Sequence, residues 1–246
     1  MSESKQGRLP LQKSMIKLLS IADMVTLLNA VLGFLALLLV FSNEFQLAAV
    51  LILLGLLADG LDGMVARRLG NGKIGEYLEP LADMISLSIA PLSLFYKMYY
   101  NTVVLQPSVH LFLGIVLVFS LLCSIIRLSS FSLLKEKQSF IGLPTSASAL
   151  FLVLTFYLSP EIWFALAGIL LLSVAMISSI RFPKPGLKVD ILTAVFIVAT
   201  VLLDRVYYNI APLLLLAALL CYILLGPMYL FVKKRSHVSE TVNTRN

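Results

Sequence analysis

The chain has 246 residues, of which 59% are hydrophobic and only 13% charged, and its formal net charge is +6. Soluble domains carry about 25% charged residues, so this chain has too few charges to cover a soluble globule. The composition excludes a soluble enzyme, a disordered chain and an ordinary nucleic-acid-binding protein. It indicates an all-α membrane protein with several spanning helices.

Eight apolar segments predict the helices of a polytopic transmembrane bundle. The fifth and the seventh are the shortest, so six spans with a re-entrant hairpin remain an alternative to eight. We expect a membrane domain over residues 21–232 and a polar tail over residues 233–246, whose last dozen residues are expected to be disordered. The basic segment 1–20 is either an amphipathic helix on the membrane surface or a disordered tail. The eight segments cover residues 22–42, 46–69, 76–99, 109–134, 143–159, 161–181, 189–204 and 209–232.

The basic residues predict the orientation of these spans. With eight spans and a cytoplasmic N-terminus, nearly all of the 19 Lys and Arg residues fall on the cytoplasmic side. Lys97 and Arg205 fall on the outer side, and Arg127 lies within a span. This bias follows the positive-inside rule. We therefore expect a multi-pass protein of the cell membrane with both termini in the cytoplasm.

Acidic residues gather where the second span ends and the third begins. A carboxylate at membrane depth costs roughly 2–3 kcal/mol, so several together require cations or a water-filled cavity. The cluster consists of Asp59, Asp62, Glu76, Glu79 and Asp83.

Helical spacing pairs these acidic residues. Asp59 and Asp62 share one helix face, and Glu79 and Asp83 share another. A turn around residues 70–72 reverses the chain, so we expect the two pairs to face each other. Hard oxygen donors at one depth favour Mg²⁺ or Mn²⁺, and four carboxylates suffice for two ions that act in phosphoryl chemistry. Zinc is disfavoured because no His or Cys lies nearby.

Small and basic residues beside the carboxylates suggest a ligand that carries phosphate. Gly63 and Gly75 leave room for a bulky molecule. Arg67, one helical turn after Gly63, is expected to bind a phosphate. The alternative is that Asp59 and Asp62 pair with Arg67 and its neighbour in a purely structural role.

The pattern of these residues resembles the signature of the CDP-alcohol phosphotransferases. That signature is Asp, two residues, Asp-Gly, two residues, Ala-Arg, a gap of about eight, Gly, three residues, Asp, three residues, Asp. The run from Asp59 to Arg67 matches it, as do Gly75 and Asp83. Two departures are present: the gap before Gly75 is one residue shorter, and Glu79 stands where the family has Asp.

Other patches resemble one branch of the family, the phosphatidylserine and archaetidylserine synthases. Together with the acidic motif they extend the resemblance over roughly residues 20–190. The patches are Ala22-Asp23, residues 26–29 with Gly33, residues 81–83 with Ser86 and Ala90-Pro91, Arg127-Leu128 with Phe131, residues 141–144 with Ala147, and residues 178–182.

The resemblance implies a fold and a reaction. The fold is a six-helix core, here with two further C-terminal spans, and a homodimer is expected. The reaction transfers a phosphatidyl-type group from a CDP-linked lipid (CDP-diacylglycerol or CDP-archaeol) to the hydroxyl of serine and releases CMP. Two Mg²⁺ or Mn²⁺ ions are held by Asp59, Asp62, Glu79 and Asp83, and Asp83 is the general base.

Three further residues are expected to bind substrate, each with an alternative. Asn29 contacts the donor nucleotide or makes an interhelical hydrogen bond. Arg127 binds phosphate or the carboxylate of the acceptor, or it pairs with the acidic cluster. Arg181 binds the serine carboxylate or anchors the chain at the cytoplasmic surface.

Three other functions remain open at this stage. The same chemistry accommodates glycerol 3-phosphate, inositol phosphate or ethanolamine as acceptor. A cation transporter is a second possibility, although no polar path crosses from the acidic cluster to the outer side. A catalytically inactive relative is the third, because Glu79 departs from the family pattern.

Overall fold

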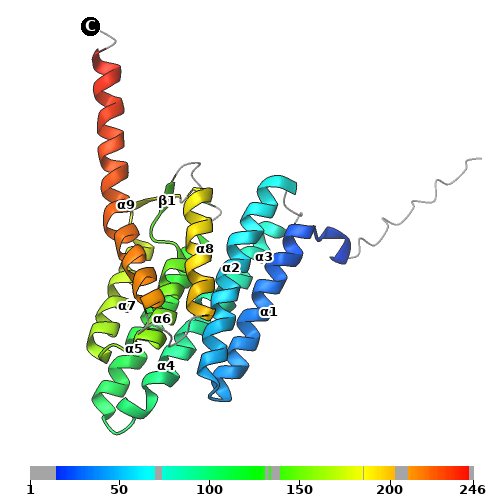
Figure 1. Ribbon diagram of the computed structural model, residues 1–246, viewed down its shortest axis with the longest axis vertical. Coiled ribbons are helices and arrows are strands. Elements are labelled where there is room, and N and C mark those ends of the chain that lie inside the picture. Colours follow the sequence, from blue (N-terminus) through cyan, green and yellow to red (C-terminus); the bar gives the residue numbers. More distant parts are fainter. Residues whose placement is uncertain are drawn as a thin grey trace, which may run out of the picture.

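The computed structural model describes residues 15–69, 74–130, 133, 139–184, 186–202 and 210–243. Within these ranges the chain is a bundle of helices with one small pair of strands (Figure 1). All eight apolar segments are helical, as the sequence predicts, and α3 and α4 share the third. The strands are β1 Ser139–Ile141 and β2 Arg181–Pro183. The helices are α1 Ile21–Phe41, α2 Phe45–Leu69, α3 Gly75–Asp83, α4 Ala90–Val103, α5 Pro107–Ser129, α6 Thr145–Leu158, α7 Ile162–Ile177, α8 Leu187–Leu202 and α9 Ile210–Asn243.

Five helical stretches in the described part of the chain are long and apolar enough to cross a membrane. Helices α6, α7 and α8 have 14, 16 and 16 residues. They extend over about 21–24 Å, against roughly 30 Å for the hydrocarbon core of a bilayer. The protein is therefore a multi-pass integral membrane protein with long and short apolar helices. The five stretches are Ile21–Phe41, Phe45–Val65, Gly75–Val103, Pro107–Ser129 and Ile210–Phe231.

Local signals set where several helices begin. The hydroxyl of Ser20 accepts a hydrogen bond from the Asp23 backbone, and the Asp23 carboxylate accepts one from the Ser20 backbone at 2.7 Å. This reciprocal capping box fixes the start of α1. Pro107 opens α5, and Pro144 stands directly before α6. Proline is favoured at such positions because its backbone lacks the N–H that a first turn leaves unpaired.

The third apolar stretch, Gly75–Val103, contains a π-helical segment, Met84–Ile89, between α3 and α4. It begins directly after Asp83 and packs against α1. A Cβ atom added to Gly33 of α1 would lie 2.5 Å from the Cα of Ser86 in this segment. Glycine at position 33 therefore permits a backbone approach that a larger residue would block.

The helices alternate in direction through the bundle. As a result, one end of the molecule holds the first residues of α1 and α3, the last residues of α2 and α9, and the strand β1 (Figure 1). We call this the motif end. Helix α1 packs most extensively against α2 and also against α3, while α6 contacts α2, α4, α7 and α9.

Two boundary predictions are wrong. The sixth segment was expected to remain helical to residue 181, but α7 ends at Ile177 and Arg181 lies in β2. There, Phe140 of β1 pairs with Phe182 of β2 in an antiparallel register. The last dozen residues are predicted to be disordered, but α9 continues to Asn243. No Gly or Pro after position 227 interrupts that helix.

Candidate active site

The acidic motif forms two levels near the motif end. Helix α2 runs toward this end, and α3 starts there and runs away from it (Figure 1). Asp62 and Glu79 are therefore the outer pair. Asp59 and Asp83 lie about one helical turn deeper and are the inner pair. The antiparallel arrangement places one carboxylate from each helix at each level.

The two carboxyl groups of the inner pair lie close together. The carboxyl groups of Asp59 and Asp83 are within hydrogen-bonding reach of each other, and both are affected by the charge of Glu79. Asp83 is only 8% exposed. Its Oδ1 accepts a hydrogen bond of 3.0 Å from Nδ2 of Asn29 on α1. Asp83 is therefore held between the first and second helices.

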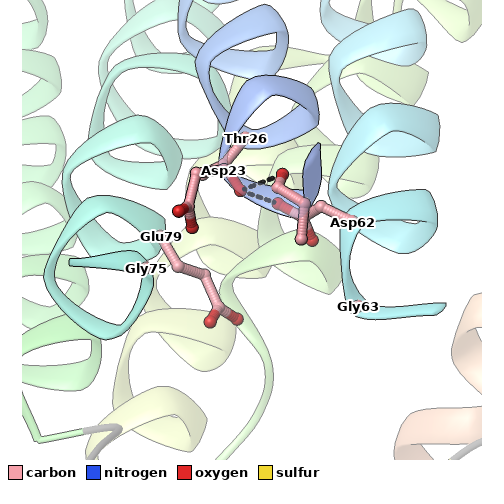
Figure 2. Close-up of a pocket in the computed structure, with 7 residues that line it drawn as sticks. Asp23, Thr26, Asp62, Gly63, Gly75 and Glu79 are labelled. Carbon is pink, nitrogen blue, oxygen red and sulfur yellow. Dashed lines mark hydrogen bonds between the residues drawn. The ribbon is translucent and has the colours of Figure 1, made fainter. Parts of the chain in front are cut away.

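The outer pair lines a small hollow between α1, α2 and α3 (Figure 2). The Thr26 hydroxyl donates a hydrogen bond of 2.7 Å to Oδ2 of Asp62, which turns that carboxylate toward α1. Glu79 lines the same hollow from α3. The complete lining is Ala22, Asp23, Thr26, Asp62, Gly63, Gly75 and Glu79.

Asp23 adds a fifth carboxylate to this region. Its side chain is 2% exposed, lines the hollow, and acts on Asp62 through its charge. The sequence pattern included Asp23 only as part of a family patch, not as a site residue. Its participation in the capping box with Ser20 explains why it is held at the start of α1.

Both glycines of the motif line the hollow. A Cβ atom added to Gly63 would meet nothing within 4 Å among the described neighbours. Gly75 is buried and lines the hollow from the start of α3. The absence of side chains at these positions leaves room for the bulky ligand that the sequence predicts.

The site concentrates negative charge. In the described part of the chain, every charged group that acts on Asp59, Asp62 or Asp83 is itself acidic. Carboxyl groups this close, at membrane depth, require a proton or a cation between them. Oxygen donors alone suit Mg²⁺ or Mn²⁺, so the donor set fits such an ion. Within the described residues, however, no three His, Cys, Asp or Glu side chains are close enough to hold a metal.

Residues 19–181 match the model of one family, described as CDP-alcohol phosphatidyltransferase. The match covers more than half of the chain and includes both acidic pairs. The chain belongs to the CDP-alcohol phosphatidyltransferase family. The resemblance seen in the acidic motif is thereby confirmed.

Several curated proteins resemble this phosphatidyltransferase. A CDP-diacylglycerol–serine O-phosphatidyltransferase of Methanocaldococcus jannaschii is 36% identical over 184 residues, which cover 72% of this chain and 81% of the relative. An archaetidylserine synthase of Methanothermobacter thermautotrophicus is 33% identical over 180 residues, 70% of this chain and 73% of the relative. A CDP-diacylglycerol–serine O-phosphatidyltransferase of Bacillus subtilis is 32% identical over 164 residues, 65% of this chain and 88% of the relative.

Two expected substrate-binding residues of this phosphatidyltransferase lie near the strand pair. Arg127 is 7% exposed, its Nε donates to the carbonyl oxygen of Leu143 at 3.2 Å, and it lies close to Tyr222 of α9. Arg181 is exposed on β2, where it pairs with Ile141 of β1. Neither arginine is among the residues that line the hollow. Their expected contacts with phosphate or acceptor remain predictions.

The remaining expectations have different outcomes. Asn29 makes an interhelical hydrogen bond, since its fully buried amide donates to Asp83, and its expected contact with the donor nucleotide stays a prediction. The turn at residues 70–72 lies outside the described residues, and so does the side chain of Arg67. The expected phosphate contact of Arg67 and its alternative pairing with the aspartates are therefore still predictions.

Most of the N-terminal segment is likewise outside the described part, which begins with a short 3₁₀ helix, Met15–Leu18.

Proposed function

We propose that this phosphatidyltransferase transfers a phosphatidyl-type group from a CDP-linked lipid to the hydroxyl of serine and releases CMP. The observation that carries the proposal is that carboxylates of α2 and α3 gather near the motif end of a membrane bundle, in an inner and an outer pair. Serine as acceptor is supported by the names of the relatives, which include serine transferases and an archaetidylserine synthase. Either CDP-diacylglycerol or CDP-archaeol is compatible with this support.

The acidic side chains have distinct roles in the proposal. Asp59, Asp62, Glu79 and Asp83 would hold two Mg²⁺ or Mn²⁺ ions, and to do so their carboxylates would have to move closer together than they lie in the described structure. When bound, such ions neutralise the diphosphate of the donor and stabilise the departing CMP. Asp83 accepts the proton of the serine hydroxyl as general base. Its contact with Asn29 leaves the carboxylate fixed before the acceptor arrives.

The reaction is then a direct displacement at phosphorus. The serine oxygen forms a bond to the phosphorus that carries the lipid. The bond from that phosphorus to the oxygen of CMP breaks, and CMP leaves with the bonding electrons. The proton of serine passes to Asp83. Because serine itself attacks the phosphorus, no covalent intermediate on the protein is needed.

The position of the hollow agrees with an amphipathic donor. It lies at the motif end, beside helices that expose apolar side chains such as Leu28 and Leu61. A lipid can place its acyl or isoprenoid chains along these helices while its nucleotide occupies the polar end. The positive-inside bias supports a cytoplasmic motif end, with both termini on that side. A homodimer is a further expectation from the family.

Release of CMP by the purified protein tests the proposal. With CDP-diacylglycerol or CDP-archaeol, Mn²⁺ or Mg²⁺, and serine, we expect CMP formation that depends on both serine and the metal. Asp83→Asn should lower kcat by about 100-fold or more, which is typical of losing a general base. Glu44→Gln removes an exposed carboxylate from the turn between α1 and α2 and serves as the matched control.

The acceptor is identified in the same assay. Glycerol 3-phosphate, inositol phosphate and ethanolamine should each support much less CMP release than serine. A preference for one of them would replace serine in the proposal while preserving the chemistry. If no acceptor supports CMP release, the proposed transferase activity is contradicted, and an inactive relative or a cation transporter is favoured.

A further inference from the structure

Helix α1 carries no residue of the acidic motif, yet it places a hydrogen-bond donor at each level of the site. Thr26 bonds Asp62 of α2 at 2.7 Å, and Asn29 bonds Asp83 of α3 at 3.0 Å. Thr26 and Asn29 are three residues apart and so lie on the same helix face. One face of α1 therefore holds one carboxylate from each of the two acid-bearing helices.

The Thr26 hydroxyl has two acceptors for a single proton. Besides Asp62, the carbonyl oxygen of Ala22 lies 3.2 Å away. The carboxylate contact is shorter, and hydrogen bonds to charged acceptors are the stronger ones. Donation to Asp62 is therefore favoured, and the Ala22 carbonyl remains available if that carboxylate moves. The side chain is buried, with 5% of its surface exposed.

The Asn29 amide lies between α2 and α3. Its Nδ2 bonds Asp83, while its Oδ1 is buried with no hydrogen-bond partner in the described structure. A Cβ atom added to Gly55 of α2 would lie 3.1 Å from that oxygen. An unpartnered buried carbonyl costs free energy. Stability alone therefore does not explain an asparagine here, whereas orientation of Asp83 does.

We propose that Thr26 and Asn29 are positioning residues of the transferase site. Thr26 orients Asp62 at the outer level, and Asn29 orients Asp83 at the inner level, so that the two carboxylates are set before metal and substrates bind. This inference rests on the proposed function. It assigns to α1 the task of fixing the relative orientation of α2 and α3 at the site.

Substitutions that remove the donors but keep the volume test this inference. Thr26→Val removes the hydroxyl, Thr26→Ser keeps it, and Asn29→Leu removes the amide. Thr155→Val is the matched control, because Thr155 is also buried in a helix and also bonds a carbonyl of its own helix, at 2.6 Å. Two quantities are measured in detergent: kcat and KM for CMP release, and the Mn²⁺ concentration that gives half of the maximal increase in Tm.

We expect Thr26→Val and Asn29→Leu to lower kcat or raise the half-saturating Mn²⁺ concentration by about 10–100-fold, as loss of an orienting partner does. The KM for the CDP-lipid should change much less. Thr26→Ser should recover most of what Thr26→Val loses. Thr155→Val should match the wild type in both quantities.

Two results would overturn the inference. One is a Thr26→Val protein that keeps the wild-type kcat and Mn²⁺ response. The other is a loss in Thr26→Val that Thr155→Val shares, since this would indicate a general packing defect. If the wild type releases no CMP, the proposed function fails, but the Mn²⁺ dependence of Tm still compares the variants. A wild type that neither releases CMP nor responds to Mn²⁺ overturns both.

Discussion

At the level of single residues, the four carboxylates of the motif are held in different ways. Asp62 and Asp83 each accept a hydrogen bond from α1. Glu79 reaches the hollow from α3 with a longer side chain (Figure 2). An additional methylene moves its carboxylate further from the helix axis than an aspartate would. The segment between Arg67 and Gly75 is one residue shorter than the family pattern, which is consistent with a compensating retraction of α3.

Glu79→Asp tests this compensation. If the longer side chain is matched to the position of α3, we expect the variant to lower kcat by about 10-fold, because misplacing a reacting group by about 1 Å has effects of this order or larger. The measurement is serine-dependent CMP release at saturating Mn²⁺. A rise in kcat would contradict the compensation and show that Glu79 is a defect relative to aspartate. Glu76→Gln, on the exposed side of the same helix turn, is the control.

The sequence predicted the acidic residues but not what holds them. Asp59, Asp62, Glu79 and Asp83 are recognisable because helical spacing is local and can be counted along the chain. The partners of Asp62 and Asp83 are 36 and 54 residues away. Spacing within one helix carries no information about such contacts. The signal for Thr26 and Asn29 was their polarity on an apolar helix, which indicated importance without indicating a partner.

At the level of elements, the close contact between α1 and the π-helical segment aligns the donors of α1 with the carboxylates. The contact point is Gly33 against Ser86. Gly33 lies one helical turn after Asn29 in α1, and Ser86 lies three residues after Asp83, the last residue of α3. A π-helical segment adds a residue to a turn, which changes the face that the following helix presents, and such segments are frequent at functional sites.

Gly33→Ala is expected to separate these two elements. The new Cβ would lie 2.5 Å from a backbone Cα atom, so α1 or the π-helical segment must move. We expect a loss of stability of about 1–3 kcal/mol, the usual cost of overpacking. The measurement is Tm in detergent, together with CMP release.

Gly114→Ala in α5 provides the comparison for that variant. A Cβ atom there would meet nothing within 4 Å in the described structure. Alanine is the better helix former by up to about 1 kcal/mol, so this variant should be neutral or slightly stabilised. Equal behaviour of the two glycine variants would contradict a special role for the α1 contact.

Element boundaries show where prediction from sequence ends. The apolar runs predict that each helix exists, because the length and hydropathy of a run suffice to identify a membrane helix. The strands β1 and β2 have three residues each and pair across two intervening helices. Neither strand has a pattern long enough to detect. Their position is instead fixed by contacts such as the Tyr222 hydroxyl of α9, which donates to the carbonyl oxygen of Pro183 at 3.1 Å.

At the level of the whole molecule, alternation of the helices brings the acidic motif, the strand pair and both ends of the described bundle to one end (Figure 1). We expect a site for a lipid diphosphate at this position to be in contact with water and within reach of the membrane interior. The enzyme can thus receive a soluble acceptor and a lipid donor at the same boundary.

Labelling of single cysteines tests this orientation. In a variant with Cys123 and Cys221 replaced by Ala, Leu105→Cys and Leu133→Cys place thiols at positions that are 88% and 86% exposed. Leu105 lies between α4 and α5, far from the motif end, whereas Leu133 follows α5 at the motif end. With a membrane-impermeant maleimide on intact cells, we expect the thiol at position 105 to react. The thiol at position 133 should react only after permeabilisation, because the positive-inside bias predicts a cytoplasmic motif end. Both thiols should react in detergent, and a reversed pattern would place the transferase site outside the cell.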